Sequence, residues 1–215
     1  MRKALVAAMV GSLVLLVNPP SASAHADLKS STPRNGAVIA TAPKTVSLTF
    51  SEPVDVEEVS LLNAKAEPIA SSFKAIGATI TVTPTTPLSV GANSVQWKAR
   101  SDDGHTITGA LAFIVGEPTP AGMPKSISTT PKITTVLNGS RSGPLNVVFS
   151  TSATSGEVEW SNPAFDGPFT WPISGNGKQA KASGILPTTG KWTMRATLIG
   201  KAGSVIVTNG AVSLG

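Results

Sequence analysis

Residues 46–54 read Val-Ser-Leu-Thr-Phe-Ser-Glu-Pro-Val, and the first five alternate between apolar and polar side chains. Because successive side chains of a β-strand point to opposite faces of its sheet, this period of two predicts a strand with one buried face. The pattern recurs at Val95 to Trp97 and at Leu111 to Val115, and turn-forming residues lie between, at Pro33 to Gly36 and Pro84 to Pro87. The first half of the chain is therefore predicted to be a compact β-sandwich.

A stretch rich in proline and glycine, Gly116 to Pro124, follows this first half. Its prolines cannot donate ladder hydrogen bonds and its glycines add chain entropy, so we predict a linker over residues 118–131. Strand patterns resume beyond it, and in the run Trp192 to Leu198 apolar and polar residues alternate strictly. We therefore expect an all-β protein in which a second small β-sandwich, residues 132–215, follows the first.

The N-terminus has the pattern of an export signal over residues 1–24. Basic Arg2 and Lys3 precede an apolar run of 14 residues, Ala4 to Val17, and the small-residue triplet Ala22 to Ala24 ends the segment. A retained membrane anchor is the alternative, but spanning a bilayer takes about 20 apolar residues. Cleavage would leave His25 as the first residue of an exported monomer without a membrane span, periplasmic, secreted or associated with the cell wall.

Composition excludes several classes of protein. The chain has no cysteine, which rules out disulfides and thiolate metal sites. Its formal charge of +5 is unevenly placed: residues 25–118 carry 7 positive and 9 negative side chains, whereas residues 132–215 carry 7 positive and 3 negative. The basic residues of the second half are scattered singly, so we predict no nucleic-acid binding.

The mature chain contains two histidines, His25 and His105. A terminal histidine offers both its imidazole and its α-amino nitrogen to a metal ion. If the segment around His105 is extended, Asp103 projects to the same side as His105, and the three residues then form a nitrogen-rich set that favours Cu(II). The alternative for this segment is an ordinary hairpin turn built on Asp103 and Gly104.

Most of the first half resembles the CopC family of copper-handling proteins, in order and over about residues 25–116. The segments that carry the resemblance are His25 to Leu28, Ser31 to Pro33, Gly36, Pro43, Val46 to Val54, Leu88, Gly91, Val95 to Trp97, Ser101 to His105 and Gly109 to Phe113. The predicted family domain covers residues 25–117.

This resemblance implies a cupredoxin-like or immunoglobulin-like sandwich that binds one Cu(II) ion per chain without catalysis. The implied ligands are the amino group and imidazole of His25, the Asp103 carboxylate and the His105 imidazole. Glu52 matches an acidic position near the copper, as a ligand or as a supporting carboxylate. The implied roles are copper sequestration, resistance, or delivery to a CopD-type membrane permease. Some relatives carry a methionine-rich Cu(I) site, but residues 56–79 contain neither Met nor His.

Two other functions remain open from the sequence. An exported, wall-associated adhesion or interaction protein could use the second sandwich, where Trp160 and Trp171 either pack in the core or form a small exposed patch. A copper monooxygenase also binds its metal through an N-terminal histidine. That chemistry needs an open coordination position and usually an aromatic residue beside it, whereas Asp103 would fill one position and the chain has no tyrosine. We therefore expect a protein that is not an enzyme.

Overall fold

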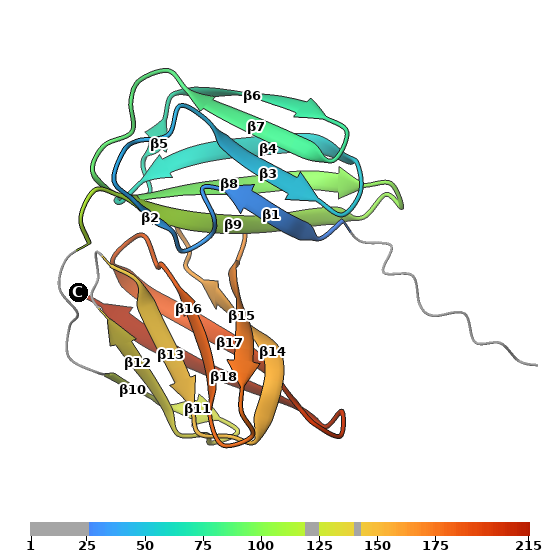
Figure 1. The fold of residues 1–215 in the computed structure, drawn as a ribbon, viewed down its shortest axis with the longest axis vertical. Coiled ribbons are helices and arrows are strands. Elements are labelled where there is room, and N and C mark those ends of the chain that lie inside the picture. Colours follow the sequence, from blue (N-terminus) through green and yellow to red (C-terminus); the bar gives the residue numbers. More distant parts are fainter. Residues whose placement is uncertain (1–25, 119–124, 140–142) are drawn as a thin grey trace, which may run out of the picture.

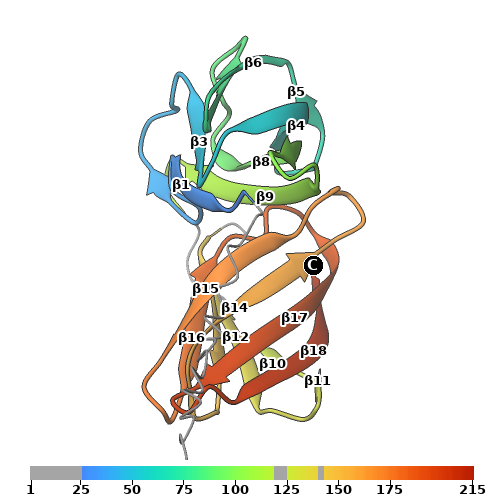
Figure 2. The ribbon, with the colours of Figure 1, turned by 90° about the vertical axis from the view of Figure 1, so that its right-hand side faces the viewer.

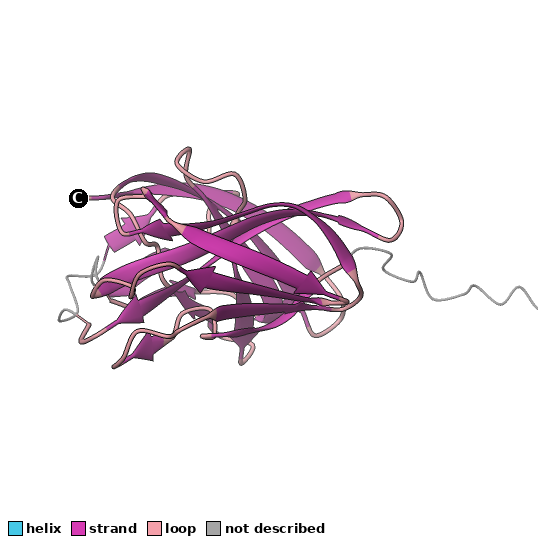
Figure 3. Cartoon of the chain, turned by 90° about the horizontal axis from the view of Figure 1, so that it is seen from above, coloured by secondary structure: helices cyan, strands magenta, loops and turns pink. Residues whose placement is uncertain are grey.

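The computed structural model describes residues 26–118, 125–139 and 143–215. The predicted signal peptide and His25 lie outside these residues. Every regular element of the described chain is a β-strand, so the all-β prediction is confirmed (Figure 3). No helix within the described ranges has the length and apolar character to cross a membrane.

The N-terminal sandwich consists of the strands β1 to β9 in two facing sheets (Figure 1). One sheet has the order β1-β3-β7-β6, and the other has the order β5-β4-β8-β9-β2. The strand bounds are β1 Leu28–Thr32, β2 Val38–Ile39, β3 Val46–Phe50, β4 Val54–Asn63, β5 Pro68–Ile69, β6 Ser71–Ile76, β7 Thr79–Pro84, β8 Gly91–Ser101 and β9 Thr106–Val115.

The alternating residues of β3 explain why this strand forms and what it buries. Val46, Leu48 and Phe50 are buried, while the polar residues between them are half-buried. Their side chains meet those of the facing sheet, including Val95 and Trp97 of β8, in one hydrophobic core. The half-buried strand predicted at residues 46–50 is therefore confirmed.

The C-terminal sandwich consists of β10 to β18, hydrogen-bonded in the order β10-β12-β13-β16-β15-β14-β17-β18-β11 (Figure 2). The strand bounds are β10 Lys125–Ile127, β11 Thr129–Thr130, β12 Thr135–Gly139, β13 Leu145–Phe149, β14 Ala153–Ser161, β15 Phe169–Gly175, β16 Ala180–Gly184, β17 Gly190–Gly200 and β18 Val205–Leu214. All four tryptophans of the chain are buried, three of them in this sandwich, so Trp160 and Trp171 form no exposed patch.

The linker predicted over residues 118–131 extends too far toward the C-terminus. Residues 125–130 form two short strands of the C-terminal sandwich: β10 pairs with β12, and β11 pairs with β18. These strands lie at the two ends of the strand order and thus bring its edges together. The physical reason is that Lys125 to Thr130 contains neither Pro nor Gly, so every backbone amide of the segment is available for ladder pairing.

Strand β9 is buried on both faces, although its predicted alternation implied one exposed face. Leu111, Phe113 and Val115 enter the core of the N-terminal sandwich. Ala110, Ala112 and Ile114 point the other way and share a core with the C-terminal sandwich. The face of Ala110, Ala112 and Ile114 was expected to be solvated. The alternation of side chains along a strand does not reveal whether another part of the chain covers one of its faces.

Candidate metal site

The hairpin between β8 and β9 carries Asp103 and His105. The backbone amide of Ser101 donates to the carbonyl of His105 over 3.0 Å, and the Gly104 amide donates to the Ser101 carbonyl over 2.8 Å. Gly104 has a φ of +85°, a left-handed conformation that favours glycine. The segment is therefore a tight turn, as the alternative interpretation of Asp103-Gly104 had it, and not an extended strand.

This turn brings Asp103 and His105 into direct contact. His105 Nδ1 lies 2.9 Å from Asp103 Oδ2. Asp103 Oδ1 accepts a hydrogen bond of 3.1 Å from the His105 amide and another from the Ser101 hydroxyl. One carboxylate and one imidazole therefore meet as expected, but through a turn and not through the side-chain period of a strand.

The hydrogen bonds to Asp103 keep its carboxylate ionised. The Ser101 hydroxyl, and after it the His105 side chain and amide, hold the pKa of Asp103 well below its usual range. The side chain of Asp103 is 20% exposed and that of His105 is 64% exposed. An ionised carboxylate beside an accessible imidazole is a donor pair suited to a divalent transition metal.

The first described residues of the chain are anchored on the side of the N-terminal sandwich that carries this hairpin. Ala26 is only 5% exposed and packs in the core of the N-terminal sandwich. The Asp27 amide donates to Ser51 Oγ over 2.9 Å, and the Ser51 amide donates to the Asp27 carbonyl over 2.8 Å. His25, the predicted third ligand, lies outside the described residues and is peptide-bonded to this anchored segment.

Glu52 lies between the anchored segment and the hairpin. It follows Ser51 directly, and Val54, two residues further on, pairs with Ser101. Oxygen Oε1 of Glu52 is buried and has no hydrogen-bond partner among the described residues. A buried carboxylate oxygen without a donor is costly, and a cation bound nearby would offset that cost.

The structure thus brings two of the four predicted residues into contact and places Glu52 on the connection between them and the N-terminal segment. Within the described ranges, no three His, Cys, Asp or Glu side chains are grouped closely enough to hold a metal ion. Asp103 and His105 are therefore a pair of neighbouring donors and not, by themselves, a complete metal site. The sequence did not identify Ser101, whose hydroxyl orients Asp103; its position two residues before the Asp-Gly turn was the available signal.

A groove runs from the anchored N-terminal segment to the C-terminal sandwich. Its volume is about 570 Å³, and its walls include Asp27, Trp97 and Ile107 from one sandwich and Glu157 and Pro172 from the other. The groove is therefore lined by residues that are close in sequence to the candidate ligands: Asp27 follows His25, and Ile107 follows His105. The sequence did not predict that the second sandwich would form one of its walls.

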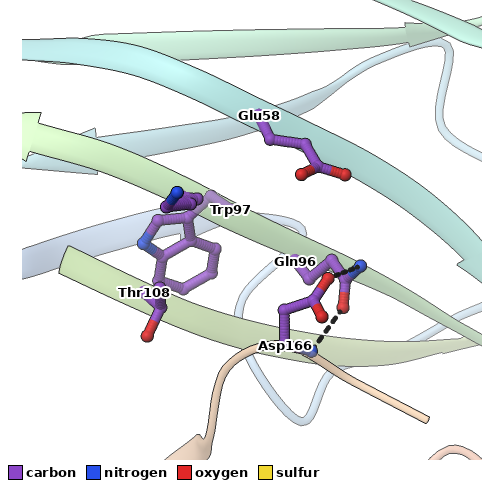
Figure 4. Close-up of a pocket in the computed structure, with 6 residues that line it drawn as sticks. Glu58, Gln96, Trp97, Thr108 and Asp166 are labelled. Atoms are coloured by element: carbon purple, nitrogen blue, oxygen red, sulfur yellow. Dashed lines mark hydrogen bonds between the residues drawn. The ribbon is translucent and has the colours of Figure 1, made fainter. Parts of the chain in front are cut away.

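A smaller pocket of about 350 Å³ also borders Trp97, where Gln96 of β8 meets Asp166 of the C-terminal sandwich (Figure 4). The Gln96 amide nitrogen donates to Asp166 Oδ2 over 3.0 Å, and the Asp166 backbone amide donates to Gln96 Oε1 over 3.1 Å. This reciprocal pair joins the strand that leads to the candidate site to the second sandwich.

The N-terminal sandwich is similar to known proteins. The family model described as the CopC domain matches residues 28–116. Copper resistance protein C of Escherichia coli is 35% identical over 122 residues, which cover 51% of this chain and 94% of that protein. Copper resistance protein C of Pseudomonas syringae pv. tomato is 34% identical over 105 residues, 44% of this chain and 82% of that protein.

A solved structure gives a further match. The crystal structure of PcoC, described as a methionine-rich copper resistance protein from Escherichia coli, is 34% identical, with 43% of this chain and 99% of that chain covered and a TM-score of 0.39. From the family match and the identity to the curated relatives, the chain belongs to the CopC family of copper resistance proteins. The family prediction is therefore confirmed, and it concerns the N-terminal sandwich.

Proposed function

We propose that this chain is an exported carrier that binds one Cu(II) ion through His25, Asp103 and His105. The α-amino group and imidazole of His25 would supply two nitrogens, and Asp103 and His105 an oxygen and a third nitrogen. Such a set of nitrogen and oxygen donors suits the tetragonal preference of Cu(II). The names of the relatives, copper resistance protein C, support copper as the ion.

The observation that carries this proposal is the contact of 2.9 Å between His105 and Asp103 at the end of the sandwich where the N-terminal segment is anchored. Two connections along the backbone support the proposal. Asp27 is bonded to Ser51, and Val54 is paired with Ser101. In Figure 1, β1 begins on the same side of the sandwich as the turn between β8 and β9.

Glu52 has a supporting role in this proposal. Its buried carboxylate oxygen would add negative charge beside the bound ion and would not itself coordinate it. Export follows from the proposed signal peptide, whose removal after Ala24 creates the amino group that binds copper. Delivery to a CopD-type membrane permease would follow binding, and the chain itself would perform no catalytic step.

Cu(II) titration of the secreted protein tests the proposal, once N-terminal sequencing has established that the chain begins at His25. We expect one tightly bound Cu(II) per chain and a tetragonal, nitrogen-rich electron paramagnetic resonance spectrum. His25→Ala and His105→Ala should each lose this spectrum, and Glu52→Gln should keep it while binding copper more weakly. A protein with one extra residue before His25 should also lose tight binding.

Asp55→Asn is a matched control, because it removes a carboxylate from β4 of the same sandwich at an exposed position. It should bind copper as the unmodified protein does. Tight binding that persists in both histidine variants would overturn the proposed ligand set. Binding that is weak in every protein would overturn the proposed function.

A further inference from the structure

The end of the C-terminal sandwich that faces away from the N-terminal sandwich is formed by four loops. The strand directions place them together: β14 and β18 begin at this end, whereas β15 and β17 finish there (Figure 2). The four loops are residues 131–134, 150–152, 176–179 and 201–204. We call this surface the distal end.

The distal end carries positive charge without negative charge. Lys132, Lys178 and Lys201 lie in three of its four loops, and all three are exposed. The three acidic residues between residues 125 and 215 lie elsewhere. Glu157 and Glu159 are in β14, and Glu159 is paired with Arg195; Asp166 contacts the N-terminal sandwich. The charge of the distal end is therefore not neutralised by carboxylates in its own loops.

Two exposed apolar side chains at the start of β18 adjoin the distal end. Val205 is 59% exposed and Ile206 is 40% exposed. Among the described residues of the C-terminal sandwich, no other large hydrophobic side chain is as exposed as these two. They follow Lys201 in the hairpin of β17 and β18, which projects at the lower right of Figure 1. Exposed apolar side chains beside lysines at a projecting tip are suited to an interface that is both apolar and anionic.

We propose that the distal end docks on an anionic lipid bilayer. The side chains of Val205 and Ile206 enter the headgroup region, and Lys132, Lys178 and Lys201 lie against lipid phosphates. A solvated polyanion would satisfy the lysines equally well but would leave the two apolar side chains in water, so the hairpin favours a bilayer. This docking does not involve Asp103 and His105, which lie in the other sandwich.

Vesicle sedimentation of the processed full chain tests the proposal. The probes are vesicles of phosphatidylcholine alone and vesicles with 30% phosphatidylglycerol, each at low and at high salt. We expect binding to the anionic vesicles only, weakened by salt. Lys201→Gln should weaken binding about fivefold, the factor that corresponds to one lysine near such a surface. Val205→Ser should also weaken it severalfold, without a change in copper affinity.

Two matched controls come from the N-terminal sandwich. Lys74→Gln removes an exposed lysine from β6, and Val90→Ser removes a valine that is 78% exposed. Both variants should bind vesicles like the unmodified chain. Three results would overturn the proposal: no binding to the anionic vesicles at low salt, controls that weaken binding as much as the distal variants, or binding that Val205→Ser leaves unchanged and a soluble polyanion abolishes.

Discussion

The backbone amide of Asp27 donates a hydrogen bond of 2.9 Å to the hydroxyl of Ser51, which fixes the segment that follows His25. A net contribution of about 1 kcal/mol is typical for such a bond, and this corresponds to about a fivefold change in an equilibrium constant. We therefore predict that Ser51→Ala weakens Cu(II) binding about fivefold in a competition titration. The electron paramagnetic resonance spectrum should not change, because no ligand is removed.

Ser30→Ala is the control for this prediction. Ser30 lies in the same strand as Leu28 and is exposed, so its replacement should leave Cu(II) affinity as it was. An altered spectrum in Ser51→Ala would show that the hydroxyl affects coordination itself. Unchanged affinity would show that the anchored segment does not position His25.

The lowered pKa of Asp103 predicts a pH-dependent contribution to the stability of the metal-free protein. Hydrogen bonds from Ser101 and from His105 stabilise the ionised carboxylate in the folded chain. A group whose pKa is lowered by folding stabilises the native state above its unfolded pKa, about 3.9 for Asp, and this contribution disappears as the pH falls through the folded value. We predict that Asp103→Asn lowers the urea midpoint at pH 6 and that the difference from the unmodified chain shrinks progressively below about pH 4.

Asp55→Asn, measured in the same way in the presence of a chelator, controls for the loss of one negative charge from the sandwich. A difference between Asp103→Asn and the unmodified chain that stays constant from pH 6 to pH 2 would contradict the assignment of this stability to the ionised carboxylate.

The sequence predicted the strands best where one face is buried and the other is polar. Leu48 and Phe50 show this, because their burial can be inferred from the polar residues between them. Alternation of apolar and polar residues could not predict the β-bulge in β4. The register of β4 and β8 shifts between Val56 and Glu58, and Glu57 is the extra residue. Its carboxylate contacts Lys98 and Arg100, each over 2.9 Å, and the first of these two contacts contributes most to a lowered pKa of Glu57.

Candidate ligands were predictable because histidine is scarce in this chain, but their geometry was not. The sequence named Asp103 and His105, and an extended segment would have placed them on one face. The positive φ of Gly104 produces a turn instead, and the Ser101 hydroxyl orients the carboxylate. Both effects depend on how β8 and β9 pair, which a local pattern does not encode. The packing of the second sandwich against β9 could likewise not be predicted from the sequence, since Ala110 and Ala112 fit a solvated face as well as a buried one.

Two buried tryptophans should respond differently to loss of the indole nitrogen. Trp192 Nε1 donates to the Thr188 carbonyl over 3.1 Å, whereas the buried Nε1 of Trp160 has no hydrogen-bond partner among the described residues. Both replacements by Phe remove similar volume. We predict that Trp192→Phe lowers the free energy of unfolding by about 1 kcal/mol more than Trp160→Phe does, because only the former breaks a hydrogen bond. Urea unfolding measures the difference, and an equal or larger loss in Trp160→Phe would contradict it.

Close backbone contact between Gly167 and Gly109 predicts that even one methyl group will disturb the joint between the sandwiches. A Cβ on Gly167 would lie 2.5 Å from the Gly109 nitrogen and 2.7 Å from its Cα, and backbone atoms of a paired strand cannot move aside easily. Next to this contact, the Ala110 amide donates to the Pro168 carbonyl over 2.9 Å. Gly167→Ala should therefore lower the free energy of unfolding by about 1–3 kcal/mol, the usual cost of overpacking. Gly215→Ala adds the same methyl group where nothing lies within 4 Å and should have no effect. If Gly167→Ala unfolds at the same urea concentration as Gly215→Ala, the loop that contains Gly167 does not pack against β9 as closely as these distances indicate. The contact between the two sandwiches then depends on the buried side chains of Ala110, Ala112 and Ile114 instead.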